Sequence, residues 1–211
     1  MSSGEGGSGG SGLPAPGYGV PELPAKYVRR RQLEQRLEAG VEAGLVVLSA
    51  PAGAGKTMLL ASWAAHRPAA TAWLSLEPED AEPHRFWGRV LTAIQVSSHL
   101  APDSMLARMH PPPVHDQRFV RLLVEGCEEL SAPCVVVLDD LHVLNGTPAM
   151  ASLASAVRSG LGRLRLVLST RSDPVIPLQR LRLDGRLTEI RSVDLSFDAG
   201  DAVRLLTGHD V

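Results

Sequence analysis

The chain has 211 residues, of which 44% are hydrophobic, and a formal net charge of −2 at pH 7. This is enough material for one α/β domain with a core, and the charge gives no reason to expect nucleic acid or an anionic membrane as partner. No apolar run approaches the roughly 20 residues of a transmembrane helix, and no secretory signal is evident. Cys127 and Cys134 are typical of reduced core thiols, so we expect a cytoplasmic protein.

The first 25 residues are rich in Gly and Ser and then in Pro, which predicts a disordered tail or linker. A helix is then predicted from the fourfold spacing of Leu33, Leu37 and Val41, and we expect Gly40 and Gly44 to end it. A proline-rich connection is expected over residues 102–116. Buried strands are predicted at 45–48, 71–76, 134–138, 164–169 and 187–190. Further helices are predicted at 58–65, 86–94, 119–130 and 149–159.

Strands that alternate with helices predict an α/β fold, in which right-handed crossovers build a parallel sheet covered on both faces. We assign residues 26–197 to this domain. From residue 198 a new helical pattern begins, with Ala202, Leu205 and Leu206 on its apolar face. We expect residues 198–211 to be the start of a helical domain cut from a longer protein.

A glycine-rich loop follows the first predicted strand and precedes a helix, which is the setting that a phosphate-binding loop requires. Successive backbone N–H groups converge on phosphate in such a loop, and the helix adds its positive end. Lys56 would reach the β- and γ-phosphates, and Thr57 would ligate Mg²⁺. Only Lys26 and Lys56 are lysines in this arginine-rich chain, which indicates that a compact ammonium is needed in the loop. The predicted nucleotide-binding residues are Ala50, Pro51, Ala52, Gly53, Ala54, Gly55, Lys56, Thr57 and Met58.

Polar residues end two other predicted strands, at the edge where α/β sheets bind ligands. Asp139 is predicted to hold Mg²⁺ through its water shell, and Asp140 to orient or deprotonate the attacking water. Arg171 is predicted to contact the terminal phosphate. From the residues alone, a polar turn at Asp139 and Asp140 and a solvated arginine at Arg171 stay open as alternatives.

Five stretches occur in order along most of the chain between Lys26 and Leu206. They are YVR at 27–29, SAPAGAGKT at 49–57, AWLSL at 72–76 with RFW at 85–87, VLDDLH at 137–142, and LSTRSDP at 168–174 with EIR at 189–191. Together they resemble the signalling NTPases called STAND, and more closely the NTPase domain of ATP-dependent LuxR-type transcription activators related to the maltose activator. Ala50 replaces the usual first glycine of the loop.

The resemblance implies an ASCE-type P-loop NTPase with sheet order 5-1-4-3-2, in which the strand before Arg171 lies between the other two ligand-bearing strands. It implies that Arg171 senses the terminal phosphate and that Tyr27, Val28 and Arg29 line the adenine side. In such proteins ADP holds a closed monomer, and ATP with an inducer favours self-association. The DNA-binding part of such proteins lies further toward the C-terminus, so we expect no DNA binding by this fragment.

The leading hypothesis is therefore a regulatory domain that binds ATP or ADP with Mg²⁺, hydrolyses ATP slowly and acts as a switch. A P-loop kinase or a transport-type ATPase is the alternative from the enzyme class. The Leu-Ser-Gly-Gly-Gln-like signature of transporters is absent, and no arginine-rich acceptor lid is evident. A nucleotide-binding module without turnover stays open as well.

Overall fold

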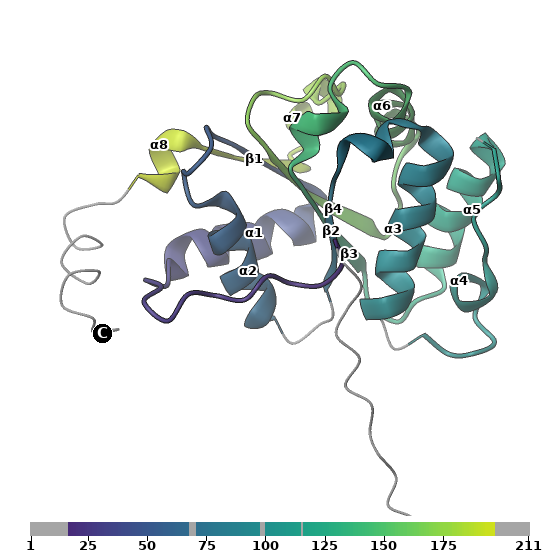
Figure 1. Ribbon diagram of the computed structural model, residues 1–211, viewed down its shortest axis with the longest axis horizontal. Coiled ribbons are helices and arrows are strands. Elements are labelled where there is room, and N and C mark those ends of the chain that lie inside the picture. The colour runs from purple at the N-terminus through teal and green to yellow at the C-terminus, as the bar shows by residue number, and fades with distance from the viewer. Residues whose placement is uncertain (1–16, 68–70, 98–99, 115, 197–211) are drawn as a thin grey trace, which may run out of the picture.

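Five parallel strands form one sheet at the centre of the protein (Figure 1). The structure is a computed structural model, and it describes residues 17–67, 71–97, 100–114 and 116–196. In spatial order the strands are β2-β3-β4-β1-β5, which is 5-1-4-3-2 when it is counted from the other edge. The predicted order and the predicted central place of β4 are therefore confirmed. The strands are β1 (Leu45–Ser49), β2 (Thr71–Ser75), β3 (Cys134–Asp139), β4 (Leu164–Thr170) and β5 (Leu187–Arg191).

The central strands are buried on both faces, because alternate side chains enter two separate cores. In Figure 1, α1 (Arg31–Ala43) and α2 (Lys56–Ala65) lie on one side of the sheet. The other side is covered by α3 (Pro83–Ser97), α5 (Gln117–Glu128) and α6 (Pro148–Ser159). The first core contains Val46, Leu48, Val135, Val137, Val167 and Ile190. The second contains Leu45, Val47, Val136, Leu138, Leu166 and Leu168.

Helix α1 continues past the point where its end was predicted. Gly40 lies inside the helix, and only Gly44 follows its last residue. A Cβ atom at Gly40 would lie 2.7 Å from the side chain of Thr188 and 2.8 Å from that of Val46. Gly40 is therefore a place of close approach between α1 and the sheet, and its prediction as a helix end is wrong.

Short elements also appear where the sequence predicted only connections. Within residues 102–116 lies the short helix α4 (Met105–Arg108). Ser104 caps its N-terminus, since Ser104 Oγ accepts a 3.3 Å hydrogen bond from Ala107 N, and Leu106 is fully buried. The expected proline-rich connection therefore contains a short helix that packs into the core. The other short helices are η1 (Pro78–Ala81), η2 (Leu141–Leu144), α7 (Gln179–Leu183) and α8 (Ser192–Leu195).

Gly17 and Tyr18, which the sequence assigned to the tail, contact β2 and α3 of the domain. Ser75 N donates a 3.0 Å hydrogen bond to Gly17 O, and the Arg89 guanidinium lies 5.2 Å from the centre of the Tyr18 ring. Residues 1–16 and the helical segment predicted at 198–211 lie outside the described residues, and the division into domains remains a prediction. Within the described part of the chain, no helix is long and apolar enough to cross a membrane.

Candidate functional site

A cavity of about 340 Å³ lies at the carboxyl ends of the central strands. Two larger cavities, of about 530 and 580 Å³, lie elsewhere in the described residues, so volume alone does not identify the site. What distinguishes the smaller cavity is that a cation, a helix N-terminus and a carboxylate converge on it. It is lined by Ala52, Gly53, Gly55, Lys56, Thr57, Met58, Asp140 and Arg171.

Two glycines set the backbone conformation of the loop that lines this cavity. Gly53 and Gly55 have φ values of 78° and 82°, in the left-handed region that favours glycine. A Cβ at either position would meet no atom within 4 Å, so conformation and not crowding is the reason for glycine there. Gly55 also precedes α2, whose first turn has no side-chain cap. The N–H groups of that turn are therefore left for an anion, as the phosphate-loop interpretation requires.

Lys56 is held over the loop by neutral partners. Its Nζ donates hydrogen bonds to Ala50 O at 2.7 Å and to Pro51 O at 3.0 Å, and the residue is only 7% exposed. Burial holds the pKa of Lys56 below its usual value, while the carboxylates of Asp139 and Asp140 act in the opposite direction. A buried ammonium whose hydrogen-bond partners are carbonyls retains its charge for an incoming anion.

Thr57 and Asp139 meet beside Lys56. The Thr57 hydroxyl donates a 2.8 Å hydrogen bond to Asp139 Oδ2, and Asp139 Oδ1 accepts from Asp140 N at 3.0 Å. A hydroxyl and a single buried carboxylate are a donor set that suits Mg²⁺, which keeps several waters when it binds to proteins. Within the described ranges, no group of three or more His, Cys, Asp or Glu residues could hold a metal by itself. The residues present therefore fit Mg²⁺ bound together with phosphate.

Asp140 is the one non-glycine residue with positive φ in the described part of the chain, at 57°. Such backbone strain is concentrated at functional sites. The turn directs Asp140 into the cavity lining and starts η2. Asp140 Oδ1 lies 3.6 Å from Nδ1 of His142, a buried atom without a hydrogen-bond partner among the described residues. Burial, and then the charge of Arg171, lower the pKa of His142.

Arg171 follows β4 and lines the cavity from an exposed position. The loop that carries Arg171 is braced by contacts that were not predicted from the sequence. Ser49 Oγ donates a 3.1 Å hydrogen bond to Asp173 Oδ1, and Arg191 forms an ion pair with the same carboxylate oxygen. Arg191 also pairs with Glu189 at 2.6 Å. Asp173 and Arg191 lie in stretches that carried the resemblance, but nothing in the sequence showed that they meet.

The structure does not bring the predicted adenine-side residues into the lining of this cavity. Arg29 pairs with Glu34 at 2.7 Å, and Ser62 Oγ donates to the same carboxylate at 2.6 Å. Val28 is buried. Through Glu34 of α1, these contacts link the segment that precedes α1 with α2, the helix that follows the glycine loop. The role of Tyr27, Val28 and Arg29 toward adenine remains a prediction.

The parallel sheet of order 5-1-4-3-2, with the glycine loop after β1 and Asp139 at the end of β3, defines a P-loop NTPase domain. Solved structures share this fold. The STAND protein with a tetratricopeptide repeat sensor, PH0952 from Pyrococcus horikoshii, has a TM-score of 0.55 and 18% identity over 92% of this chain and 27% of its own. The Walker-type ATPase PABY2304 of Pyrococcus abyssi has a TM-score of 0.58 and 19% identity, over 88% and 60%.

Curated proteins that resemble the chain are much longer than it is. The serine/threonine-protein kinase PknK of Mycobacterium tuberculosis is 30% identical over 191 residues, which are 88% of this chain and 17% of the kinase. The HTH-type transcriptional regulator MalT of Yersinia enterocolitica is 28% identical over 177 residues, or 83% of this chain and 19% of MalT. The chain thus spans less than a fifth of these relatives. No family model matches it.

Together these findings confirm the predicted resemblance to STAND-type NTPase domains and to LuxR-family regulators of the maltose-activator kind. At this level the chain is a P-loop NTPase domain with a candidate nucleotide site after β1.

Proposed function

We propose that this domain is a nucleotide-dependent switch that binds ATP or ADP with Mg²⁺ and hydrolyses ATP slowly, within a transcription regulator. The observation that carries the proposal is the convergence of Lys56, Thr57, Asp140 and Arg171 on one cavity, with Asp139 hydrogen-bonded to Thr57 at 2.8 Å. Each of these groups would contact a different part of a magnesium-bound nucleoside triphosphate: the phosphates, the metal or the attacking water.

In this proposal the loop N–H groups from Gly53 onward and the N-terminus of α2 bind the phosphates, and Lys56 adds its positive charge. Thr57 and Asp139 hold Mg²⁺, which when bound neutralises charge on the phosphate oxygens. Asp140 orients a water molecule toward the terminal phosphate. The segment 27–29 lines the adenine side.

Two features support switching and slow turnover. Arg171 is exposed and reaches the cavity from a loop tied to β1 and β5 through Asp173, so it can report the presence of a terminal phosphate. The Asp140 side chain is also 47% exposed, and a reaction centre that admits water gains little from electrostatic stabilisation. We expect a protein that carries this domain to act in the cytoplasm, to associate with itself in a nucleotide-dependent way, and to contact DNA through residues outside the domain.

Binding and turnover measured side by side test the proposal. We expect ATP and ADP to bind in a Mg²⁺-dependent manner, with a kcat well below the roughly 10 s⁻¹ typical of enzymes. Binding without any turnover would leave a nucleotide-binding module, and turnover at metabolic rates would favour a kinase or transport-type ATPase. Absence of binding would contradict the proposal altogether. Asp139→Asn serves as the hydrolysis-deficient control.

A further inference from the structure

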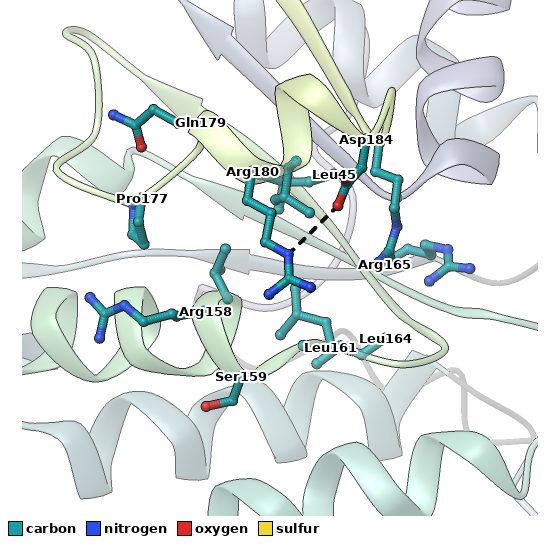
Figure 2. A pocket seen from close by; sticks show the side chains of 15 residues that line it. Leu45, Arg158, Ser159, Leu161, Leu164, Arg165, Pro177, Gln179, Arg180 and Asp184 are labelled. Atoms are coloured by element: carbon teal, nitrogen blue, oxygen red, sulfur yellow. Dashed lines mark ion pairs between the residues drawn. The ribbon is translucent and has the colours of Figure 1, made fainter.

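A second cavity, of about 530 Å³, lies at the amino ends of β1 and β4, whereas the glycine loop follows the carboxyl end of β1. Figure 2 shows the side chains that line this cavity. It is bounded by the first residues of β1 and β4, the end of α6 and the helix α7. None of its lining residues in the described part of the chain belongs to the phosphate-loop cavity. What this cavity binds is therefore a question independent of the nucleotide.

The inner wall of this cavity is apolar. Leu45 and Leu164 are each 1% exposed, and Val157 and Leu161 beside them are buried as well. Leu181 of α7 is partly buried against the same core. Such a wall favours a ligand with an apolar body.

The polar part of the lining is dominated by arginine. Arg158, Arg165, Arg180 and Arg186 line the cavity, and among the described lining residues only Asp184 adds a carboxylate. That carboxylate lies 3.8 Å from Arg180. Figure 2 shows the Arg180 side chain reaching from α7 toward Leu161 and Leu164, with Arg158 and Arg165 to either side. Four guanidinium groups around one concave surface create a positive potential that attracts an anion.

One donor of the Arg165 guanidinium makes no hydrogen bond among the described residues. This donor is the buried Nε, whereas Nη1 donates to Gly162 O. Burial and then the charge of Arg186 lower the pKa of Arg165. Glu128 opposes this effect, but one oxygen of its carboxylate already accepts a 2.8 Å hydrogen bond from Arg163 N. A buried donor without an acceptor costs free energy that a bound anion would recover.

We propose that this cavity binds a small organic acid, with its apolar body on the leucine wall and its carboxylate or phosphate held by the arginines, Arg165 foremost. A guanidinium fork matches either acid group through paired hydrogen bonds. A concave volume of about 530 Å³ with an apolar inner wall fits a small molecule and not a nucleic acid strand, which is bound along extended basic grooves. Strands β1 and β4 run from this cavity to Ser49 and Thr170, so the ligand would sit at the far end of the strands that carry the nucleotide site.

Calorimetric titration with three matched probes tests the proposal. We use 2-naphthoate, 2-naphthyl phosphate and the neutral 2-naphthol, with Lys56→Ala as a second protein so that the phosphate loop cannot account for the signal. Both acids should bind saturably and about tenfold or more tighter than naphthol, the equivalent of a charge-assisted hydrogen bond. Naphthoate should bind equally to the parent chain and to Lys56→Ala. Failure of nucleotide binding would leave these expectations unchanged.

Variants then locate the site. Arg165→Gln should weaken both acids about tenfold, whereas Arg118→Gln, which removes an exposed arginine of α5 outside this cavity, should leave them unchanged. If Arg165→Gln does not fold, the double variant Arg158→Gln/Arg186→Gln, at two exposed positions, decides the question. Equal affinity for naphthol and the acids, unchanged binding in the folded variants, or binding only to vesicles of anionic phospholipid would each overturn the proposal.

Discussion

The Thr57 hydroxyl donates a 2.8 Å hydrogen bond to Oδ2 of Asp139, across 82 positions of sequence. The contact joins the first turn of α2 to the carboxyl end of β3, beside the Nζ of Lys56. The metal and phosphate contacts predicted from separate motifs are thereby brought to one place.

Asp139→Asn should remove most of the Mg²⁺ dependence of ATP binding. The amide oxygen can still accept the Thr57 hydrogen bond, so the fold should survive, but the charge that attracts the cation is lost. ATP titrations with Mg²⁺ and with EDTA measure the effect. Asp103→Asn, at an exposed acid far along the chain, is the matched control. If Asp139→Asn and Asp103→Asn behave alike, Asp139 is not the metal residue.

Arg171→Ala should weaken ATP more than ADP, because only ATP carries the phosphate that the guanidinium would contact. Loss of one charge-assisted contact corresponds to about tenfold or more in affinity. The ratio of the two dissociation constants is the quantity to compare, with Arg118→Ala as control. An equal change for both nucleotides would rule out a sensor role.

His142 should titrate below its usual pKa of 6.5, because burial and the positive charge of Arg171 disfavour its protonated form. The chemical shifts of the His142 ring protons, recorded by NMR as a function of pH, measure this pKa. Arg171→Ala should raise it, since one of the two main causes is removed. A pKa of His142 that does not move in Arg171→Ala would show that the two groups do not lie close together in solution.

The same shift makes stability depend on pH. The folded state favours neutral His142, so its contribution to the free energy of unfolding is complete above about pH 6.5 and is lost as the pH falls through the lower folded pKa. As the pH falls from 7.5, the free energy of unfolding of His142→Asn should therefore decrease less than that of the parent. Urea unfolding at several pH values measures the difference, and parallel curves would contradict the assignment.

Gly40→Ala should destabilise the fold by about 1–3 kcal/mol, because the added methyl group would crowd Thr188 and Val46 across the interface between α1 and the sheet. Helix propensity alone predicts the opposite sign, a gain of about 1 kcal/mol. Ala39→Gly at the exposed neighbouring position measures that propensity directly. A Gly40→Ala variant more stable than the parent in urea would show that α1 does not approach the sheet this closely.

Much of the fold and the core of the site could be predicted from the sequence because the signals are local. The glycine loop that leads to Lys56 follows the short apolar run of β1, and Asp139 ends that of β3. Parallel strands bring such ends to one edge of the sheet. The strand order came from the resemblance and not from any local pattern. The Gly40 error had a tertiary cause, since a glycine in a helix resembles a helix end until its neighbours are known.

The bracing of the Arg171 loop could not be predicted in this way. Ser49 and Asp173 are 124 positions apart, and Arg191 joins them from a third strand. Such a contact depends on register and on side-chain direction, which a single sequence does not encode locally. The same holds for the second cavity, whose arginines are scattered over α6, β4, α7 and the turn before β5. In the sequence these four arginines cannot be told apart from the many other arginines of the chain, so no local pattern predicts that they line one cavity.

The most direct test of the central claim compares the chain's only two lysines. Lys56→Ala removes a buried ammonium over the glycine loop, and Lys26→Ala removes an exposed one. We predict that Mg²⁺-ATP binds about tenfold or more weaker to Lys56→Ala, with an unchanged circular dichroism spectrum, and equally to Lys26→Ala and the parent. Equal ATP affinity in folded Lys56→Ala and in the parent would contradict the assignment of this loop as the nucleotide site.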